Sequence, residues 1–192
     1  VKNAGSHFML SMLPEWKPFP AVLKGRIRLK ANDSTNPVAV GDRVRFETQP
    51  EDLGEVTLTN PALITEVLDR KNYVVRKSTN LSRQSHVIAA NIDMAFAVVT
   101  LYFPEVKLPF LDRMLVTCEV YGVPVTILLN KVDLYRQEAP ETVENFINIY
   151  TKAGYNVVET SAKTGEGIEE LRKICDGKVC LFSGESGVGK SS

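Results

Sequence analysis

"GESGVGKSS", from Gly184 to Ser192, ends the chain and fits the pattern G-x-x-x-x-G-K-[ST] of a phosphate-binding loop (P-loop). Glycines in such a loop let backbone N–H groups turn inward around phosphate oxygens, and we expect this of Gly184, Gly187 and Gly189. The residues predicted to surround the phosphates are Gly184, Glu185, Ser186, Gly187, Val188, Gly189, Lys190, Ser191 and Ser192. The apolar run "KVCLFS" before the loop predicts a strand that leads directly into it.

Two side chains of this loop carry specific chemistry. Lys190 is expected to reach the β- and γ-phosphates and is the one residue to which we assign a catalytic role, while the Ser191 hydroxyl is expected to ligate Mg²⁺. The alternative is a chance glycine-rich turn before a helix. Four fixed positions after a buried strand should occur by accident in well under about one chain in a hundred, so we take the loop as real.

A second motif, "LLNKVDL", indicates which base is bound. Asn130, Lys131 and Asp133 follow a predicted buried strand, "VPVTILL", and N-K-x-D resembles the guanine-reading motif of the GTPase superfamily. A carboxylate at Asp133 can accept from guanine N1–H and the 2-amino group, whereas adenine would leave it buried and unpaired. Sites of that kind reject the wrong partner by roughly 10⁴-fold or more. We expect Asn130 to tie the loop to the base edge and the Lys131 stem to lie along the ring. The alternative for this motif alone is a polar turn at a strand end.

The stretch "ETSAKTGEG" supplies a third motif. Ser161, Ala162 and Lys163 follow the next predicted strand, as the S-A-K motif does in the same superfamily, where the alanine N–H meets guanine O6. Three motifs at three strand ends, all serving one ligand, are very unlikely to coincide by chance. The sequence therefore predicts a guanine-nucleotide site.

Residues 93–192 alternate strands and helices, which is typical of an α/β domain with a mostly parallel sheet. "MAFAVVTLY", "VPVTILL", "YNVVET" and "KVCLFS" are the predicted strands. The first predicted helix ends near Gly122 and has one apolar stripe, formed by Leu111, Met114, Leu115 and Cys118. The second begins at Pro140 and ends near Gly154, and its apolar stripe is Val143, Phe146, Ile147 and Tyr150. The third is short and has the sequence "GIEELRKIC".

Residues 1–77 have a different pattern, in which short runs of alternating apolar and polar residues are separated by turns. This pattern predicts a small antiparallel β-barrel such as an OB-fold. In "KGRIRLK" Ile27 and Leu29 lie opposite Arg26, Arg28 and Lys30, and in "DRVRFET" Val44 and Phe46 lie opposite Arg43 and Arg45. Residues 1–83 carry 13 basic and 9 acidic side chains, net +4, against 10 and 14, net −4, in residues 84–192. An RNA-binding wall and an ordinary half-exposed sheet both fit this pattern. Residues 78–92 are polar without a clear period and are predicted to be a linker.

Several classes of protein are excluded. The three cysteines, Cys118, Cys175 and Cys180, show no C-x-x-C spacing and are expected to be small core residues in a reducing cytosol, not a disulfide frame or a zinc site. No apolar run reaches the roughly 18 residues of a membrane span, and we expect no secretory signal, since the apolar start is short and lacks a basic lead and a cleavage site. His86, in the predicted linker, is assigned no catalytic role.

The order of the motifs is unusual. Ordinary GTPases begin with the P-loop, whereas here N-K-x-D comes first, S-A-K second and the P-loop last, so the predicted domain is circularly permuted. Permutation is tolerated because domain termini lie at the surface and are often close together. We expect the switch segments to follow Ser192, and the chain to be a fragment that binds nucleotide weakly by itself.

A basic barrel followed by a permuted GTPase resembles the bacterial ribosome-small-subunit-dependent GTPases of the RsgA (YjeQ) family. The resemblance rests on "STNPVAVGD", "NLSRQSHVIAANID", "LDRMLVTCEVYGVPV", "NKVDL", "SAKTGEGIEEL" and "SGVGKSS", and covers most of the chain. It implies a GTPase that acts late in maturation of the small (30S) ribosomal subunit, with GTP or GDP and Mg²⁺ as ligands and ribosomal RNA as partner. It also implies a Zn²⁺-binding domain beyond Ser192, a cytoplasmic monomer, and no DNA or membrane partner.

Two other functions stay open at this stage. One is a nucleotide-gated RNA scaffold with negligible turnover, which a broken switch motif would favour. The other is a permuted GTPase that acts on a different ribosomal target, such as the large subunit. An ATPase is the poorest candidate, because Asp133 has no partner on adenine.

Overall fold

The computed structural model describes residues 2–4, 7–12, 14–25, 37–48, 56–77 and 85–191. The chain divides into an N-terminal unit, Val1–Asn91, and a C-terminal unit, Ile92–Ser192. Residues 85–90 of the predicted linker form a strand, β7, that pairs with β6, so the linker prediction is wrong for these residues. The remainder of that segment up to residue 84 lies outside the described residues.

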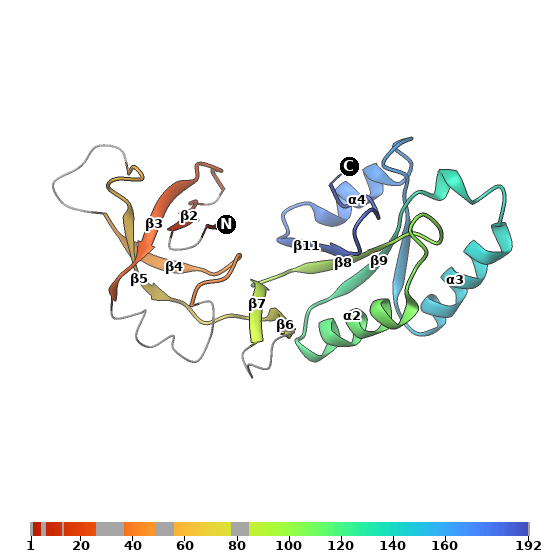
Figure 1. Ribbon diagram of the computed structural model, residues 1–192, viewed down its shortest axis with the longest axis horizontal. Helices are drawn as coiled ribbons and strands as arrows, with labels where there is room; N and C mark the ends of the chain where they lie inside the picture. Colours follow the sequence, from red (N-terminus) through yellow and green to blue (C-terminus); the bar gives the residue numbers. More distant parts are fainter. Residues whose placement is uncertain are drawn as a thin grey trace. The chain divides into compact units, whose positions relative to one another are not determined.

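The N-terminal unit contains a five-stranded sheet in the order β1-β2-β3-β5-β4 (Figure 1). Its strands are β1 (Lys2–Ala4), β2 (His7–Leu10), β3 (Phe19–Leu23), β4 (Val44–Glu47) and β5 (Ala62–Val67). Three of the four pairings are antiparallel as predicted, but β3 and β5 run parallel. β5 follows β4 along the chain and lies between β4 and β3 in the sheet, where it runs antiparallel to β4 and parallel to β3. The expectation of an all-antiparallel sheet is therefore wrong for the β3–β5 pair.

Apolar side chains from β2, β3, β4 and β5, the strands of this sheet whose side chains are described, form its core. Phe8, Ala21 and Ile64 are buried in it, and the Phe19 and Phe46 rings pack with their centroids 5.2 Å apart. The predicted alternation in "DRVRFET" is confirmed, because Val44 and Phe46 pack against this core while Arg43 and Arg45 are exposed. The basic residues predicted to face outward at 26–30 lie outside the described residues.

Two of the exposed basic side chains described in this sheet have acidic neighbours. Arg45 lies 3.3 Å from Glu66 and Lys24 lies 3.2 Å from Glu47, with all four side chains more than half exposed. The cationic character predicted for this part of the sheet is therefore partly neutralised by cross-strand carboxylates.

A second, two-stranded sheet completes the N-terminal unit. It consists of β6 (Tyr73–Lys77) and β7 (Ser85–Ala90), which run antiparallel. An ion pair lies beside it: Arg70 donates two hydrogen bonds of 2.7 Å to the Asp42 carboxylate, which also accepts the Ala39 N–H at 2.8 Å. The Asp42 side chain is fully buried, and Arg70 provides its counter-charge.

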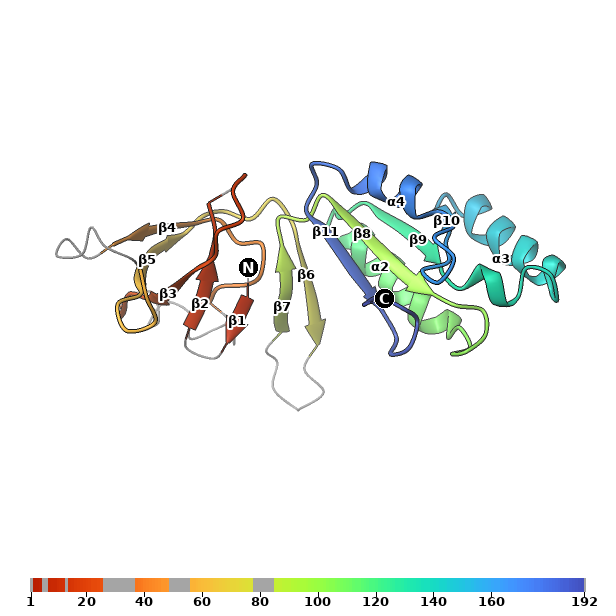
Figure 2. The same cartoon turned by 90° about the horizontal axis from the view of Figure 1, so that it is seen from above.

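The C-terminal unit has the predicted α/β architecture. Its four strands are all parallel and lie in the order β10-β9-β8-β11 (Figure 2). The elements in chain order are β8 (Met94–Val99), α2 (Leu108–Val120), β9 (Val125–Leu129), the 3-10 turn η1 (Val132–Leu134), α3 (Pro140–Lys152), β10 (Asn156–Glu159), α4 (Ile168–Cys175) and β11 (Cys180–Gly184).

Helices cover both faces of this sheet, α2 and α3 on one and α4 on the other (Figure 1). The predicted stripes are confirmed: Leu111, Leu115 and Cys118 of α2 are buried, as are Val143, Phe146 and Tyr150 of α3, with Met114 and Ile147 packed beside them. Leu171, Ile174 and Cys175 of α4 pack on the other face. Within the described ranges, every helix falls short of the length and apolarity that a membrane crossing needs.

Candidate functional site

The three predicted motifs follow β11, β9 and β10. Because these strands are parallel, their carboxyl ends lie at one edge of the sheet and the three loops meet there. From β8 the chain moves to β9 on one side, while β11 lies against β8 on the other side. Such a reversal of strand order is the point at which open α/β sheets bind ligands.

The glycines of the P-loop serve two different purposes. Gly187 and Gly189 have positive φ angles of 85° and 92°, which side-chain-bearing residues rarely adopt, as predicted for a loop that turns its amides inward. Gly184 has no such angle. A Cβ on Gly184 would lie 2.2 Å from the Val98 carbonyl oxygen of β8. Gly184 is therefore required by the close approach of β11 to β8, and the turn-forming role predicted for it is corrected.

Lys190 lies along its own loop. Its Nζ donates to the carbonyl oxygens of Gly184 at 3.0 Å and Glu185 at 2.5 Å. The ammonium group thus lies at the mouth of the loop, exposed, and is within reach of phosphate oxygens by rotation of its flexible stem. Ser191 is exposed at the last described position, and Ser192 lies outside the described residues.

Asn130 connects all three loops. Its Nδ2 donates to the Val188 carbonyl of the P-loop at 2.9 Å, and its Oδ1 accepts the Ala162 N–H at 3.2 Å and the Thr160 hydroxyl at 3.3 Å. The side chain is buried, with an exposed fraction of 4%. The partners of Asn130 in the structure are thus the two neighbouring loops, and the contact with a base edge that the sequence predicts stays a prediction.

Lys131 also ties loops together. Its backbone is left-handed, with φ 64° and ψ 32°, and its Nζ donates to the carbonyl oxygens of Gly187 and Phe103, both at 2.7 Å. Phe103 belongs to the loop between β8 and α2. The Lys131 side chain therefore extends from the N-K-x-D motif to both the P-loop and the loop before α2.

The Asp133 carboxylate is held by a residue of the neighbouring loop. The Ser161 hydroxyl donates to Asp133 Oδ1 at 2.7 Å, and Ser161 is fully buried. Ala162 follows, exposed, with its N–H directed to Asn130, and Lys163 lies in the same exposed turn. The structure therefore brings Asp133 and the Ala162 amide to one place, as the two motifs predict.

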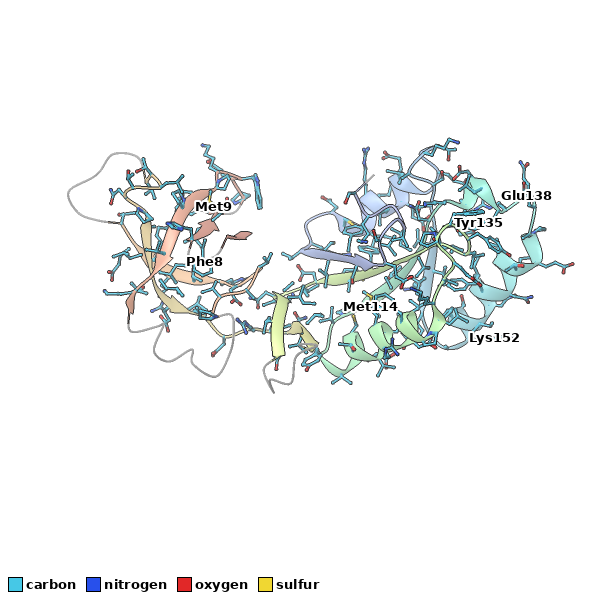
Figure 3. The ribbon with its side chains drawn as sticks, viewed as in Figure 1. Phe8, Met9, Met114, Tyr135, Glu138 and Lys152 are labelled. Carbon is cyan, nitrogen blue, oxygen red and sulfur yellow. The ribbon has the colours of Figure 1, made fainter. Side chains whose placement is uncertain are left out.

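Tyr135 holds the backbone of the N-K-x-D motif in place. Its side chain, labelled in Figure 3, is buried, and its hydroxyl donates to the Asn130 carbonyl. Burial raises the pKa of this phenol well above its usual value, so the hydroxyl remains a donor. On the surface, Arg136 forms ion pairs with Glu159 of β10 and with Glu166. The two pairs connect the segment that follows η1 to the S-A-K loop.

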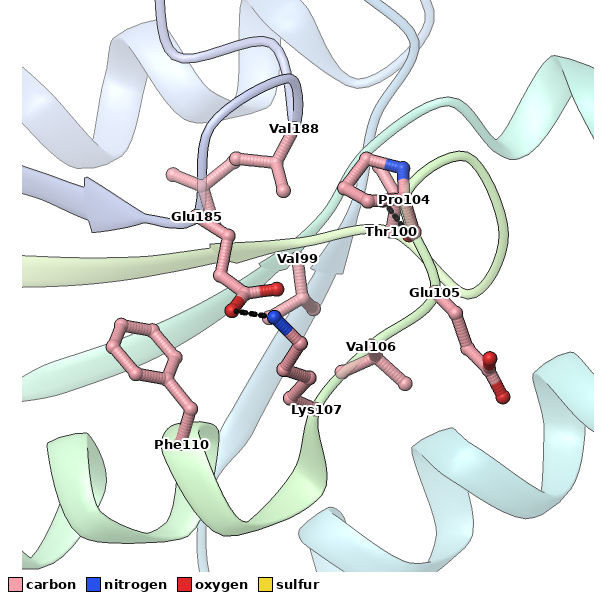
Figure 4. Close-up of a pocket in the computed structure, with 10 residues that line it drawn as sticks. Val99, Thr100, Pro104, Glu105, Val106, Lys107, Phe110, Glu185 and Val188 are labelled. Atoms are coloured by element: carbon pink, nitrogen blue, oxygen red, sulfur yellow. Dashed lines mark hydrogen bonds and ion pairs between the residues drawn. The ribbon is translucent and has the colours of Figure 1, made fainter.

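One ion pair at this edge is not predicted by any sequence motif. Lys107, the residue before α2, lies with its Nζ 2.9 Å from Glu185 Oε1 of the P-loop (Figure 4). The only signal was Glu185 itself, since a carboxylate inside an anion-binding loop needs a counter-charge. The two residues are 78 positions apart, and no motif points to Lys107.

Potential metal ligands are sparse in the part of the chain that the structure describes. No group of three or more His, Cys, Asp or Glu side chains there could hold a metal ion. Cys118, Cys175 and Cys180 are free thiols. The Ser191 hydroxyl and phosphate oxygens are hard oxygen donors of the kind that Mg²⁺ takes, so the residues present fit that ion.

Comparison with known proteins gives matches along the whole chain. A family model described as RsgA GTPase matches residues 67–192. A Bacteroides fragilis protein named small ribosomal subunit biogenesis GTPase RsgA is 45% identical, over 100% of this chain and 59% of that protein. A protein of the same name from Flavobacterium psychrophilum is 41% identical, over 100% of this chain and 54% of that protein. The chain thus spans little more than half the length of these relatives.

Solved structures agree with these matches. The crystal structure of YjeQ from Thermotoga maritima superposes with a TM-score of 0.68 at 35% identity, covering 91% of this chain and 55% of that one. The structure of YloQ, described as a circularly permuted GTPase, has a TM-score of 0.67 at 23% identity, covers 98% of this chain and 59% of that one, and shares the fold. With the family model matched over most of the chain and three motif loops joined at one sheet edge, this chain belongs to the RsgA GTPase family.

Proposed function

We propose that the protein binds guanine nucleotides at the joined loops of β9, β10 and β11 and hydrolyses GTP to GDP. The observation that carries this proposal is the position of Asn130, which hydrogen-bonds the P-loop at Val188 and the S-A-K loop at Ala162. One buried side chain thereby fixes the distance between a phosphate-binding loop and a base-reading loop, which is what a nucleotide requires.

The base is selected by two groups on neighbouring loops. Asp133 accepts from guanine N1–H and the 2-amino group, and the Ala162 N–H donates to O6 by exchanging its bond to Asn130. Adenine presents an acceptor at N1 and an amino donor at C6, so the Asp133 carboxylate and the Ala162 N–H would each face a group of their own kind and lose a hydrogen bond. The Lys131 stem lies along the base while its Nζ holds the P-loop at Gly187.

Hydrolysis is transfer of the γ-phosphoryl group to water, in which the protein contributes positioning and charge stabilisation. Backbone amides of residues 185–191 surround the phosphates, and Lys190 leaves the loop carbonyls to meet the β- and γ-phosphate oxygens. The Ser191 hydroxyl would hold Mg²⁺, which supplies further neutralisation of the phosphate charge when bound. The water-positioning group is not among the residues to which we assign a role.

The N-terminal unit is proposed to be an OB-fold that binds ribosomal RNA. A sheet of five short strands, with one strand inserted out of sequence order, fits the Greek-key OB-fold architecture. The relatives are named for biogenesis of the small ribosomal subunit. We therefore propose that this protein acts on the small (30S) subunit, in the cytoplasm, and that nucleotide state controls its docking and release.

The test is GTP turnover by the full-length gene product, with and without purified small ribosomal subunits. A large stimulation by small subunits, and none by large subunits, is the expected result. GTP binding without turnover in either case would replace the enzyme with a nucleotide-gated RNA scaffold. Stimulation by large subunits alone would assign a different ribosomal target, and failure to bind GTP would contradict the site itself.

A further inference from the structure

The P-loop carries an acidic side chain of its own. Glu185 is the second residue of the loop, its backbone carbonyl accepts a hydrogen bond from Lys190, and its side chain is 25% exposed. A negative charge in a phosphate-binding loop opposes phosphate binding, because the carboxylate and the phosphate repel each other, most strongly where water is partly excluded. The repulsion is larger for a triphosphate than for a diphosphate, since the γ-phosphate adds negative charge.

Lys107 provides the counter-charge. Its Nζ lies 2.9 Å from Glu185 Oε1, and Figure 4 shows the two side chains meeting across a hollow, with Phe110, Val99 and Val188 around it. The carboxylate is directed toward the start of α2, away from the other loop residues. Lys107 therefore both neutralises Glu185 and determines where its carboxylate lies.

The loop that carries Lys107 is fixed to the P-loop at a second point. Lys131 donates to Phe103 and Gly187 at once, and the Thr100 hydroxyl donates to the Pro104 carbonyl at 2.7 Å. Both contacts lie within seven residues of Lys107 along the chain. These contacts hold the loop backbone beside the P-loop, so the exposed Lys107 side chain starts from a position within reach of Glu185.

A purely structural role does not account for the pair. The Lys107 side chain is 71% exposed, and exposed ion pairs contribute little to folding. The same charge acts more strongly on a neighbouring highly charged ligand than on the fold. We infer that Lys107 is a positioning residue that holds the Glu185 carboxylate off the phosphate path and so sets the preference of the site for GTP over GDP, an inference that rests on the proposed GTP site.

The ratio of GTP to GDP affinity in the full-length gene product measures this role. We use a slowly hydrolysed GTP analogue and GDP, each titrated by calorimetry. Lys107→Met should lower the ratio by about threefold to tenfold, because it leaves the carboxylate of Glu185, a residue of the P-loop, without its counter-charge. Lys107→Arg should keep the ratio, since the charge is retained. Lys17→Met, which removes a lysine paired with Glu15 at 2.7 Å in the N-terminal unit, is the control for net charge and should leave the ratio unchanged.

The variant Glu185→Gln distinguishes an effect of the Lys107 charge from an effect of the Lys107 side chain on the structure. Glu185→Gln added to Lys107→Met should restore the wild-type ratio, and Glu185→Gln alone should keep or raise it. An unchanged ratio in Lys107→Met, no rescue by Glu185→Gln, or a lower ratio in Glu185→Gln alone would each overturn the inference. Glu185→Gln alone keeps the test decisive if Lys107→Met does not fold. Failure of the wild-type protein to bind GTP would instead overturn the proposed function.

Discussion

Asn130 donates a hydrogen bond to the Val188 carbonyl, 58 residues later in the chain, and accepts one from the Ala162 N–H. Asn130→Ala removes the partner of the buried Val188 carbonyl and of the Ala162 N–H, so we expect a loss of about 1–3 kcal/mol in the free energy of unfolding and weaker guanine-nucleotide binding. Urea unfolding and GDP titration measure the two effects. Asn148→Ala, at an exposed position of α3, is the matched control and should change neither.

Asp133→Asn should convert base preference. The Asn side chain can still accept the Ser161 hydroxyl bond, but it meets guanine N1–H with the wrong pattern and matches xanthine instead. We expect GTP affinity to fall by at least about 10²-fold and xanthosine triphosphate affinity to rise, since the mismatch leaves a buried polar group unpaired. Competition binding measures both. Asp176→Asn, after the end of α4, is the control, and an unchanged preference in Asp133→Asn would contradict the assignment of Asp133.

Gly184→Ala should destabilise the C-terminal unit more than Gly122→Ala. An added Cβ at Gly184 would meet the Val98 carbonyl oxygen at 2.2 Å, which forces β11 away from β8. Gly122 has φ +64° with open space around it, so alanine there costs only the left-handed conformation, about 1–2 kcal/mol. Thermal unfolding of the two variants gives the comparison. Equal destabilisation would mean that the close approach of β11 to β8 is unimportant.

Arg70→Met should destabilise the N-terminal unit by about 3–5 kcal/mol, because it leaves the fully buried Asp42 carboxylate without its cation. Lys24→Met removes one partner of an exposed pair and should cost at most about 1 kcal/mol. Urea denaturation of both variants checks the contrast. The double variant Asp42→Asn with Arg70→Met should recover part of the loss, and no recovery would show that Arg70 acts through packing.

Stability should fall in alkaline solution partly through Cys118. Burial raises the pKa of this thiol from 9.0 to about 11 in the folded protein. Between these values the unfolded chain loses the proton and the folded chain keeps it, so folding stability declines by up to about 2–3 kcal/mol as pH rises. Urea unfolding from pH 8 to 11 should show a smaller decline in Cys118→Ala than in the wild type. Parallel curves for the two proteins would contradict the raised pKa.

Much of the nucleotide site could be predicted from local sequence. A buried parallel strand followed by N-K-x-D, S-A-K or the P-loop places these residues at one sheet edge without any knowledge of tertiary contacts. The helical stripes of α2 and α3 followed from the spacing of residues such as Leu111 and Phe146. These signals are strong because each is contained within one element or one turn.

The parts that could not be predicted depend on contacts between distant segments. Lys107 and Glu185 meet across 78 residues, and the parallel pairing of β3 with β5 is set by the path between them. β7 was mistaken for linker because "SHVIAA" follows a polar stretch, and its partner β6 stabilises it only in the folded chain. The requirement for glycine at Gly184 likewise comes from a neighbouring strand, β8.

The position of β11 at the end of the described chain has a consequence for synthesis. A ribosome making this protein completes β8, β9 and β10, with Asp133 and Ala162, before it translates β11 and the P-loop. Domains generally begin to fold as they emerge, and each of the first three strands is joined to the next by a local helix. Asp133 and Ala162 are thus made before β11 delivers the P-loop, so the three loops can meet only after β11 has paired with β8.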